Sequence, residues 1–334
     1  MSEARVTAGV ADTIPAVAGD KTPGRSGRAA KARPARPGGR RKRLELVLLL
    51  TPATLLFAGF VLAPMALAAY YSFYNWNGYG TLTSAGLSNY TSAIKGTNFQ
   101  HSIWHNLIIV GLSLVIQLPL SIGLAMLLNR NLKGRAFLRL VVFAPYVLSE
   151  AITAVIWYQM LQPSGFVDQI LTSVGLGSQV HDWLGSTSLV LYTLFVVITW
   201  KYIGFGIILL LAGLQGVPAE LREAAALDGA SSWQITRHVV LPLLGPTIRI
   251  WIFLSVIGSL QLFDLVWIMT RGGPAEASNT MVTYIYNFGI SQQQYGFASA
   301  VAVILFIICF AFALVYQRFV LRRDTEGALT RVVG

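Results

Sequence analysis

The chain has 334 residues, of which 54% are hydrophobic and only 12% are charged, and its mean hydropathy is +0.60. A soluble globular chain carries roughly 25% charged residues, so this chain has too little polar surface to coat a water-soluble protein of its size. The composition excludes a soluble enzyme and predicts an all-α integral membrane protein. The single cysteine, Cys309, also excludes a disulfide framework and a cysteine-based zinc site.

Residues 1–43 carry most of the net charge of +11. This segment has eleven Lys and Arg residues against three acidic residues, while the remainder of the chain is nearly balanced. The segment is rich in Ala, Gly, Pro and Arg and has no aromatic residue that would stack on a nucleic-acid base. We expect it to be a disordered cytoplasmic tail, with contact to anionic lipids as the functional alternative.

Six stretches are long and apolar enough to cross a bilayer, which requires about 20 residues of helix. They lie at approximately Leu44–Tyr71, Trp104–Leu128, Leu140–Leu161, Leu189–Leu211, Ile248–Met269 and Ala298–Phe319. The first is far longer than the 7–15-residue core of a cleaved signal peptide, so we expect it to be retained. The six spans predict one domain over residues 44–323, followed by a second cytoplasmic tail at residues 324–334.

The distribution of Lys and Arg predicts how the spans are oriented. If the N-terminus is cytoplasmic, the inner tails and loops hold 22 of the 25 Lys and Arg residues. The outer loops then hold only Lys95 and Arg271, and Lys201 falls within a span. We therefore predict that the N- and C-termini are both cytoplasmic. Aromatic residues gather where the first span would leave the membrane, as in an interfacial belt: Tyr70, Tyr71, Tyr74 and Trp76.

Few polar side chains lie within the predicted spans: Gln117, Glu150, Lys201, Gln261 and Asp264. An ionisable residue at membrane depth is a functional candidate, but Glu150 and Lys201 are close enough to span ends that we expect them to reach water. Prolines also occur within spans, at Pro52, Pro64, Pro119 and Pro145. The carbonyls that prolines leave unbonded must find partners on neighbouring helices, so the spans are expected to form a packed bundle.

The sequence shows no constellation for catalysis or nucleotide hydrolysis. It has neither a G-x-x-x-x-G-K-[ST] phosphate loop nor an H-E-x-x-H pair. The histidines all fall in predicted loops or at helix ends: His101, His105, His181 and His238. We predict that the chain is not an enzyme and holds no metal or cofactor of its own.

The loop between the fourth and fifth spans, at about residues 214–245, predicts a short helix-turn-helix on the cytoplasmic face. Pro218 suits the first position of a helix, and the residues that follow it are good helix formers. Gly229 can adopt the left-handed conformation that ends a helix, and Ser231 or Ser232 can cap a second helix, which we expect to stop at Pro242. Three acidic residues against two permanent cations disfavour DNA binding, so a protein-docking surface is the better interpretation.

This loop contains an ordered set of short motifs: Glu223-Ala224-Ala225, Asp228-Gly229-Ala230 and Leu241-Pro242. The set resembles the EAA loop of permease subunits in bacterial binding-protein-dependent ABC importers, and we call residues 214–245 the EAA loop. The stretch Ser72–Gly78 resembles the S-F-x-x-W-N-G motif of the maltose and glycerol-3-phosphate type within that family. Further matches are Asn106-Leu107, Phe143–Tyr146, Leu214-Gln215, Pro218–Leu221, Phe263-Asp264 and Thr270–Pro274. One departure is Thr236, where the family often has Phe.

The resemblance implies the fold of a type I ABC importer permease, a six-helix transmembrane bundle in the bacterial plasma membrane. It implies that the chain forms half of a pore for a sugar, probably an oligosaccharide in this family, together with a second permease subunit. An ATPase subunit dimer would bind the ATP, and an extracytoplasmic sugar-binding protein would deliver the substrate. The EAA loop would dock in a cleft of the ATPase, where Glu223 would meet a cation and Ala224 and Ala225 would allow close approach.

A sugar site needs aromatic platforms with amide or carboxylate partners, and five residues offer these groups: Trp200, Tyr202, Gln261, Phe263 and Asp264. Each of them also suits ordinary helix packing. A stand-alone ion-coupled secondary carrier is the alternative function, but such carriers usually show internal repeats and ionisable groups at the midplane. Only Asp264 is a candidate of that kind, and no repeat is visible. A membrane enzyme is a third possibility, for which no catalytic constellation exists.

Overall fold

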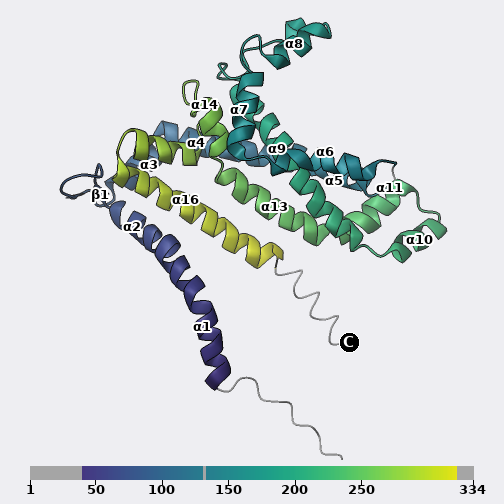
Figure 1. Ribbon diagram of the computed structural model, residues 1–334, viewed down its shortest axis with the longest axis horizontal. Helices are drawn as coiled ribbons and strands as arrows, with labels where there is room; N and C mark the ends of the chain where they lie inside the picture. Colours follow the sequence, from purple (N-terminus) through teal and green to yellow (C-terminus); the bar gives the residue numbers. More distant parts are fainter. Residues whose placement is uncertain (1–39, 131–132, 322–334) are drawn as a thin grey trace, which may run out of the picture. The chain divides into compact units, whose positions relative to one another are not determined.

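The computed structural model describes residues 40–130 and 133–321, which divide into units at residues 1–56 and 57–334 (Figure 1). Most of the predicted N-terminal tail and all of the C-terminal tail lie outside the described residues. The first unit contains all but the last residue of α1 (Arg40–Phe57). Within α1 the hydroxyls of Thr51 and Thr54 donate hydrogen bonds to carbonyls one turn earlier, at 2.6 and 2.8 Å.

The second unit is helical, with a short antiparallel pairing of two strands in which Tyr74 lies opposite Ser84. Its first half contains η1 (Ala58–Leu62), α2 (Ala63–Tyr71), β1 (Tyr74–Asn75), β2 (Thr83–Ser84), α3 (Ser88–Lys95), α4 (Thr97–Leu112), η2 (Ser113–Gln117), α5 (Leu118–Leu128), α6 (Arg135–Val147), α7 (Glu150–Met160), α8 (Phe166–Ser173) and η3 (Gly177–Gln179). Its second half contains α9 (Val190–Gln215), α10 (Ala219–Leu227), α11 (Ser232–Ile235), η4 (Thr236–Val240), α12 (Leu241–Leu243), α13 (Gly245–Leu260), α14 (Asp264–Thr270), α15 (Met281–Tyr286), η5 (Asn287–Ser291), α16 (Tyr295–Tyr316) and η6 (Gln317–Leu321).

Four helices in the described part of the chain are long and apolar enough to cross a membrane: Glu45–Tyr71, Thr97–Leu128, Val190–Gln215 and Tyr295–Val320. Two further pairs of helices pass the same test together, but each pair is bent: Arg135–Val147 with Glu150–Met160, and Ser232–Leu243 with Gly245–Leu260. The structure therefore has four to six membrane-crossing segments, depending on whether each bent pair is one span.

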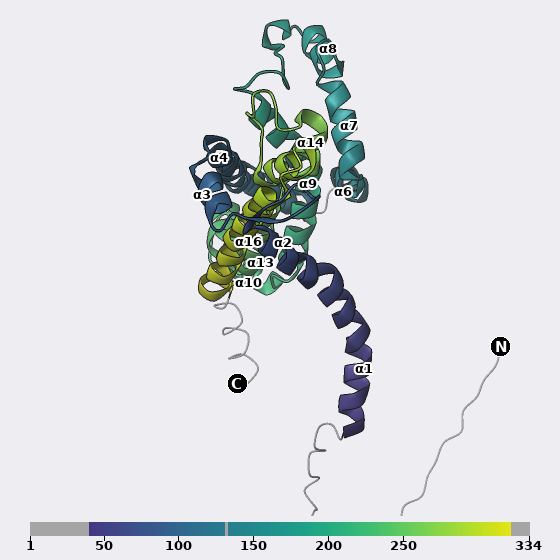
Figure 2. The same cartoon turned by 90° about the vertical axis from the view of Figure 1, so that its left-hand side faces the viewer.

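The third predicted span is not one continuous helix, as the sequence had led us to expect. It breaks after α6, and α7 turns away from α6 by 97° (Figure 2). Leu148 and Ser149 between them have extended backbones, and the Ser149 hydroxyl accepts a hydrogen bond from the Ile152 amide at 3.2 Å. Ser149 thus caps a new helix at membrane depth, because a free amide there would be costly.

The fifth predicted span is also interrupted, because α13 ends at Leu260 and α14 begins only at Asp264. The carbonyls exposed by this ending accept hydrogen bonds from distant side chains. Asn106 Nδ2 donates to the Ser259 carbonyl at 2.6 Å, and Thr280 Oγ1 donates to the Leu262 carbonyl at 2.8 Å. Asn106 Oδ1 also accepts from the Met281 amide at 2.9 Å, so this buried side chain joins the end of α13 to the start of α15.

A π-helical turn directly precedes each of three prolines. Pro64 follows η1, Pro119 follows η2 and Pro242 follows η4, each in the first turn of the next α-helix. Proline has no amide hydrogen and its ring clashes with the carbonyl four residues earlier, and the wider π turn relieves both problems. The expectation that the second helix of the EAA loop stops at Pro242 is therefore wrong, since α12 continues to Leu243.

The core of the second unit lies around α9, which contacts α5, α6 and α13 (Figure 1). In the most apolar window of α9, 56% of the residues are buried, compared with 22% in Thr97–Leu128 and 28% in Tyr295–Val320. A helix that is apolar on all sides and this deeply buried is central to a membrane bundle.

The motif at Ser72–Gly78 packs against the start of α16. The indole of Trp76 stacks on Tyr71 with ring centroids 4.5 Å apart and lies 5.9 Å from the ring of Tyr295. The amide of Gly296 donates to the Trp76 carbonyl at 3.2 Å, and a side chain at Gly296 would overlap the backbone of Tyr74. The predicted aromatic cluster at the end of the first span therefore exists, and it fastens the first loop to the last long helix.

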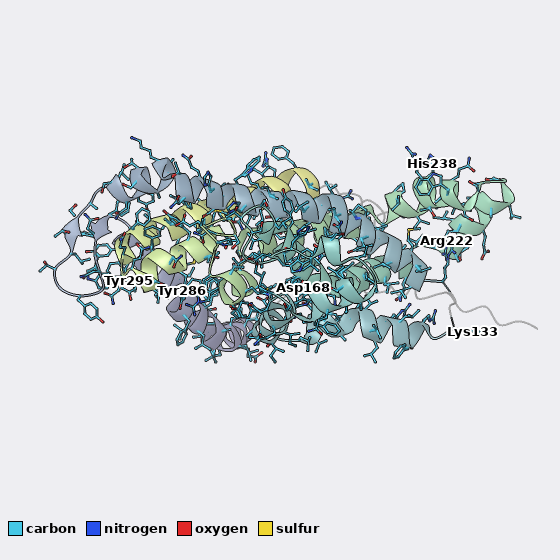
Figure 3. The ribbon with its side chains drawn as sticks, turned by 90° about the horizontal axis from the view of Figure 1, so that it is seen from above. Lys133, Asp168, Arg222, His238, Tyr286 and Tyr295 are labelled. Carbon is cyan, nitrogen blue, oxygen red and sulfur yellow. The ribbon has the colours of Figure 1, made fainter. Side chains whose placement is uncertain are left out.

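Basic residues from separate loops lie at the same end of the second unit. Lys133, Arg222 and His238 lie together at one end, and Tyr295 lies toward the other (Figure 3). This common location agrees with the orientation derived from the basic residues.

Candidate functional site

A cavity of about 370 Å³ lies between α4, η2, α6, α7, α9, α13 and α14, and we call it the central cavity. Its lining residues are Ile109, Ser113, Gln117, Tyr146, Glu150, Ile198, Tyr202, Phe205, Trp251, Leu254, Ser255, Gly258, Ser259, Gln261, Leu262, Phe263 and Asp264. The interruptions of the third and fifth predicted spans both open onto this cavity, since Glu150 and Asp264 are the first residues of α7 and α14.

Two carboxylates form one corner of the central cavity. The hydroxyl of Tyr202 donates a hydrogen bond to Glu150 Oε1, and the carboxyl groups of Glu150 and Asp264 interact with each other. Each carboxylate lies in the first turn of a helix, where unpaired backbone amides provide a positive field. The breaks in the two spans therefore stabilise two acidic groups at a depth where an isolated carboxylate would be costly.

Lys201 occupies the position behind this corner, and its side chain is 2% exposed. Its Nζ donates to the carbonyls of Pro145 at 3.1 Å and Tyr146 at 3.0 Å, and also to that of Leu148. These are carbonyls at the C-terminal end of α6, which have no amide partner in their own helix. The expectation that Lys201 reaches water is therefore wrong, because it caps a broken helix inside the bundle.

Ser113 and Gln117 form the part of the wall contributed by the π-helical turn η2. Their exposed fractions are 1% and 5%, and neither side chain makes a hydrogen bond within the described part of the chain. Buried polar groups are normally hydrogen-bonded, so a polar side chain of this kind that lines a cavity is available to a solute or to water. π turns frequently occur at functional sites.

Aromatic rings complete the lining. Tyr146 stacks on Phe205 with centroids 5.2 Å apart, and Phe263 lies 5.2 Å from Tyr286 behind the wall. The indole of Trp251 lies against Gly206 of α9, where any side chain would overlap its Nε1. The cavity therefore combines flat apolar faces with hydroxyl, amide and carboxylate groups.

The structure brings together four of the five residues predicted for a substrate path: Tyr202, Gln261, Phe263 and Asp264. It does not place Trp200 with them, because this side chain, 37% exposed, packs edge-on against Trp157 with centroids 5.5 Å apart. The α-helical period turns Trp200 about 200° away from Tyr202. That period could have predicted the separation.

Several lining residues were not predicted for the path, notably Ser113, Tyr146, Glu150 and Trp251. A usable signal existed for Ser113 and Gln117, because polar residues four positions apart share one face of a helix. No local pattern identifies Trp251, which faces the cavity only because Gly206 leaves room beside it.

The turn of the EAA loop has the predicted conformation. Gly229 has a φ of +82°, the amide of Ala230 donates to the Ala225 carbonyl at 3.0 Å, and the amide of Gly229 donates to the Ala226 carbonyl at 3.1 Å. This is the hydrogen-bond pattern of a Schellman motif, in which a left-handed residue ends the helix. The turn is therefore set by backbone geometry, independently of any partner.

The second helix of the EAA loop starts with a capping box. The Ser231 hydroxyl accepts from the Gln234 amide at 3.4 Å, and Gln234 Oε1 accepts from the Ser231 amide at 2.7 Å. Ser231, not Ser232, is thus the cap, and α10 starts at Ala219, with Pro218 in the capping position. Helix ends commonly differ by a residue between assignments.

The surface of the EAA loop combines exposed apolar and charged side chains. Leu227 is 89% exposed and Trp233 is 66% exposed. Glu223 and Ala224 are exposed on α10, and Ala225 is half-buried. Leu241 is half-buried while Pro242 is exposed. Large apolar side chains exposed beside charges at a loop outside the apolar spans are typical of a protein-docking surface.

No three His, Cys, Asp or Glu side chains come together as a metal site in residues 40–130 and 133–321. The central cavity and the EAA loop are therefore the two candidate sites, and neither contains a cluster of metal ligands.

Comparison of the sequence with protein families gives a match over residues 117–324 to the family described as "Binding-protein-dependent transport system inner membrane component". The chain is 33% identical over 246 residues to the multiple sugar-binding transport system permease protein MsmF of Streptococcus mutans, which covers 73% of this chain and 84% of the relative. It is 32% identical over 234 residues to the trehalose/maltose transport system permease protein MalF of Thermococcus litoralis, which covers 70% and 78%.

The fold is similar to that of a chain in the crystal structure of a bacterial alginate ABC transporter in complex with an alginate pentasaccharide-bound periplasmic protein. The TM-score is 0.74, the identity is 24%, and the match covers 84% of this chain and 96% of that one. This likeness shows that the helical arrangement is shared.

Proposed function

The chain belongs to the family of binding-protein-dependent transport system inner membrane components, in its carbohydrate-uptake group, and we propose that it forms half of the translocation pore of an ATP-driven oligosaccharide importer. It is a multi-pass membrane protein and a transport component. The observation that supports a sugar substrate best is the central cavity, in which aromatic faces meet hydroxyl, amide and carboxylate groups. Pockets that orient a small ligand are commonly built in this way.

Tyr202, Gln261, Phe263 and Asp264 are the proposed substrate-path residues, joined by Gln117 and Glu150. Each polar group among them can exchange hydrogen bonds with sugar hydroxyls, and the rings supply apolar faces. Trp200 is left out because it does not line the cavity.

The EAA loop is the proposed contact with a separate ATPase. Leu227 and Trp233 supply apolar area, and Glu223 supplies a charge that would meet a cation of the partner. The rigid turn at Gly229 would transmit movement of α10 to α11 and α13. ATP would be bound by the ATPase dimer, so this chain would need no cofactor or ATPase site of its own.

The other partners in this proposal are a second permease subunit, which supplies the other half of the pore, and an extracytoplasmic sugar-binding protein. The names of the similar proteins support both, since one relative is a sugar-binding transport system permease and the structural neighbour was crystallised with a periplasmic protein. The chain would cross the plasma membrane six times with both ends cytoplasmic. The gathering of Lys133, Arg222 and His238 at one end supports this orientation (Figure 3).

The test exchanges one charge in the EAA loop. In the complete importer reconstituted in liposomes, Glu223→Lys should leave membrane levels unchanged but lower ATPase association and sugar uptake by roughly tenfold or more, because it reverses an interfacial charge. Glu45→Lys, which reverses an exposed acidic residue in α1, is the matched control and should transport normally.

Normal uptake by the Glu223→Lys importer would contradict the proposed coupling. The same preparation without ATPase subunits distinguishes the alternative function. Uptake by this chain alone, driven by an ion gradient, would favour a secondary carrier instead.

A further inference from the structure

We infer that the central cavity passes neutral and amine-bearing sugars and excludes sugars that carry carboxylates, such as uronic acids. This inference rests on the proposed function, because it takes the cavity as the path of the sugar, and it adds the charge class of the substrate. Five features of the cavity support it: its acidic pair, its lack of cationic lining residues, the engagement of Lys201, its unpartnered polar wall and its aromatic faces.

The only charged groups on the described lining of the cavity are acidic. Glu150 and Asp264 both line it and interact with each other, and no Lys, Arg or His belongs to the described lining. A carboxylate of a sugar would enter a space already occupied by this acidic pair. Like charges repel several times more strongly in a protein interior than in bulk water.

Lys201 is the cation nearest to this pair in function, since it attracts Glu150 electrostatically. Its ammonium group is nevertheless held by the carbonyls of Pro145, Tyr146 and Leu148, and it does not line the cavity. An ammonium group provides three donors, and these three carbonyls accept from it. Lys201 is therefore engaged in capping α6 and is not available to bind an anionic ligand, and one cation leaves the two carboxylates with a net negative charge.

The polar wall at Ser113 and Gln117 suits a sugar without charge. Both side chains are more than nine-tenths buried, line the cavity and have no hydrogen-bond partner within the described residues. A hydroxyl and an amide can each donate and accept, so they match hydroxyl groups of either polarity. The rings of Trp251 and Tyr146 offer flat faces for the sugar ring, and an amino group would gain attraction from the acidic pair.

The test measures direct binding to the complete importer in nanodiscs without the sugar-binding protein, so that the selectivity of that protein does not enter. Saturation-transfer NMR and tryptophan fluorescence would give the Kd of maltotriose, of a glucosamine trimer and of trigalacturonate. We expect trigalacturonate to bind at least tenfold more weakly than the other two. Gln117→Ala should weaken binding of maltotriose and the glucosamine trimer at least fivefold, which assigns the signal to this cavity.

Two charge-neutral variants test the cause of the exclusion. Glu150→Gln with Asp264→Asn should reduce the difference between trigalacturonate and maltotriose to less than threefold. Asp264→Asn alone, which keeps the contact between Tyr202 and Glu150, should reduce it partly and guards against a folding defect. Glu45→Gln removes an exposed carboxylate that does not line the cavity and should leave the difference unchanged.

The outcomes separate this inference from the proposed function. Equal binding of trigalacturonate and maltotriose by the native importer would overturn the charge exclusion and leave sugar binding intact. A tenfold difference that persists in the doubly neutral variant would also overturn it. Failure of the folded native importer to bind any of the three sugars would overturn the sugar function, and the charge exclusion with it.

Discussion

The Nζ of Lys201 donates a hydrogen bond to the backbone carbonyl of Tyr146 at 3.0 Å, between residues 55 positions apart in the chain. This contact joins the middle of α9 to the end of α6. It places a positive charge where a helix ends inside the apolar part of the bundle, so the break in the third predicted span depends on a side chain from the fourth.

Replacement of Lys201 with methionine should destabilise the protein. Lys201→Met leaves the three carbonyls at the end of α6 without a donor, and unpaired buried polar groups cost about 1–3 kcal/mol each. Since part of this cost is recovered by rearrangement, we expect a loss of about 2–4 kcal/mol. Thermal unfolding of the purified importer would measure it, with Lys95→Met, at an exposed lysine in the last turn of α3, as a control that changes little. An unchanged unfolding midpoint for Lys201→Met would contradict the capping role.

A methyl group at Gly206 should disturb the central cavity. Its Cβ would overlap Trp251 Nε1 and lie 3.0 Å from Ser121 Oγ, so Gly206→Ala should cost about 1–3 kcal/mol through overpacking. It should also displace Trp251 and lower sugar uptake. Gly111→Ala in α4 is the control, because its Cβ would meet nothing within 4 Å and should stabilise the helix by up to about 1 kcal/mol. Equal uptake and stability in the two variants would show that Gly206 is not needed for close packing.

The turn of the EAA loop should be sensitive to a branched side chain. Gly229 has a φ of +82°, a left-handed conformation that costs L-residues about 1–2 kcal/mol. Gly229→Val should therefore reorient α10 relative to α11 and lower the amount of ATPase that co-purifies with the importer. Gly175→Val carries nearly the same strain, at a φ of +81°, and both positions have open space around the Cβ. Equal loss of ATPase association in the two variants would indicate general misfolding.

The predicted orientation can be checked with reporter fusions. A reporter inserted after residue 323 or within residues 224–232 should report the cytoplasm, and one within residues 86–96 should report the outside, because basic loops stay on the cytoplasmic side. Cysteine-accessibility labelling at the same positions provides an independent measurement. Reversed signals would contradict the cytoplasmic location of the EAA loop and so its contact with an ATPase.

Much of the molecule is determined locally and could be predicted from the sequence. Four predicted spans coincide closely with helices of the structure, as Leu189–Leu211 does with Val190–Gln215, because each required only a long apolar run. The turn at Gly229 and the cap at Ser231 were predictable for the same reason. Their hydrogen bonds join residues no more than five positions apart, so neighbouring residues contain all the necessary information.

The central cavity, in contrast, depends on contacts between residues far apart in the chain. Lys201 has an ordinary span sequence around it, and only the carbonyls of α6 explain why it stays buried and leaves an acidic cavity beside it. Likewise, nothing near Leu260 predicts that α13 ends there, because the donors for its carbonyls, Asn106 and Thr280, come from other helices. In a bilayer a broken helix is stable only where partners for its free backbone groups are already in place. The apolar runs by themselves therefore determine that the chain crosses the membrane, and the packing of the helices decides where those crossings break and which side chains face the cavity.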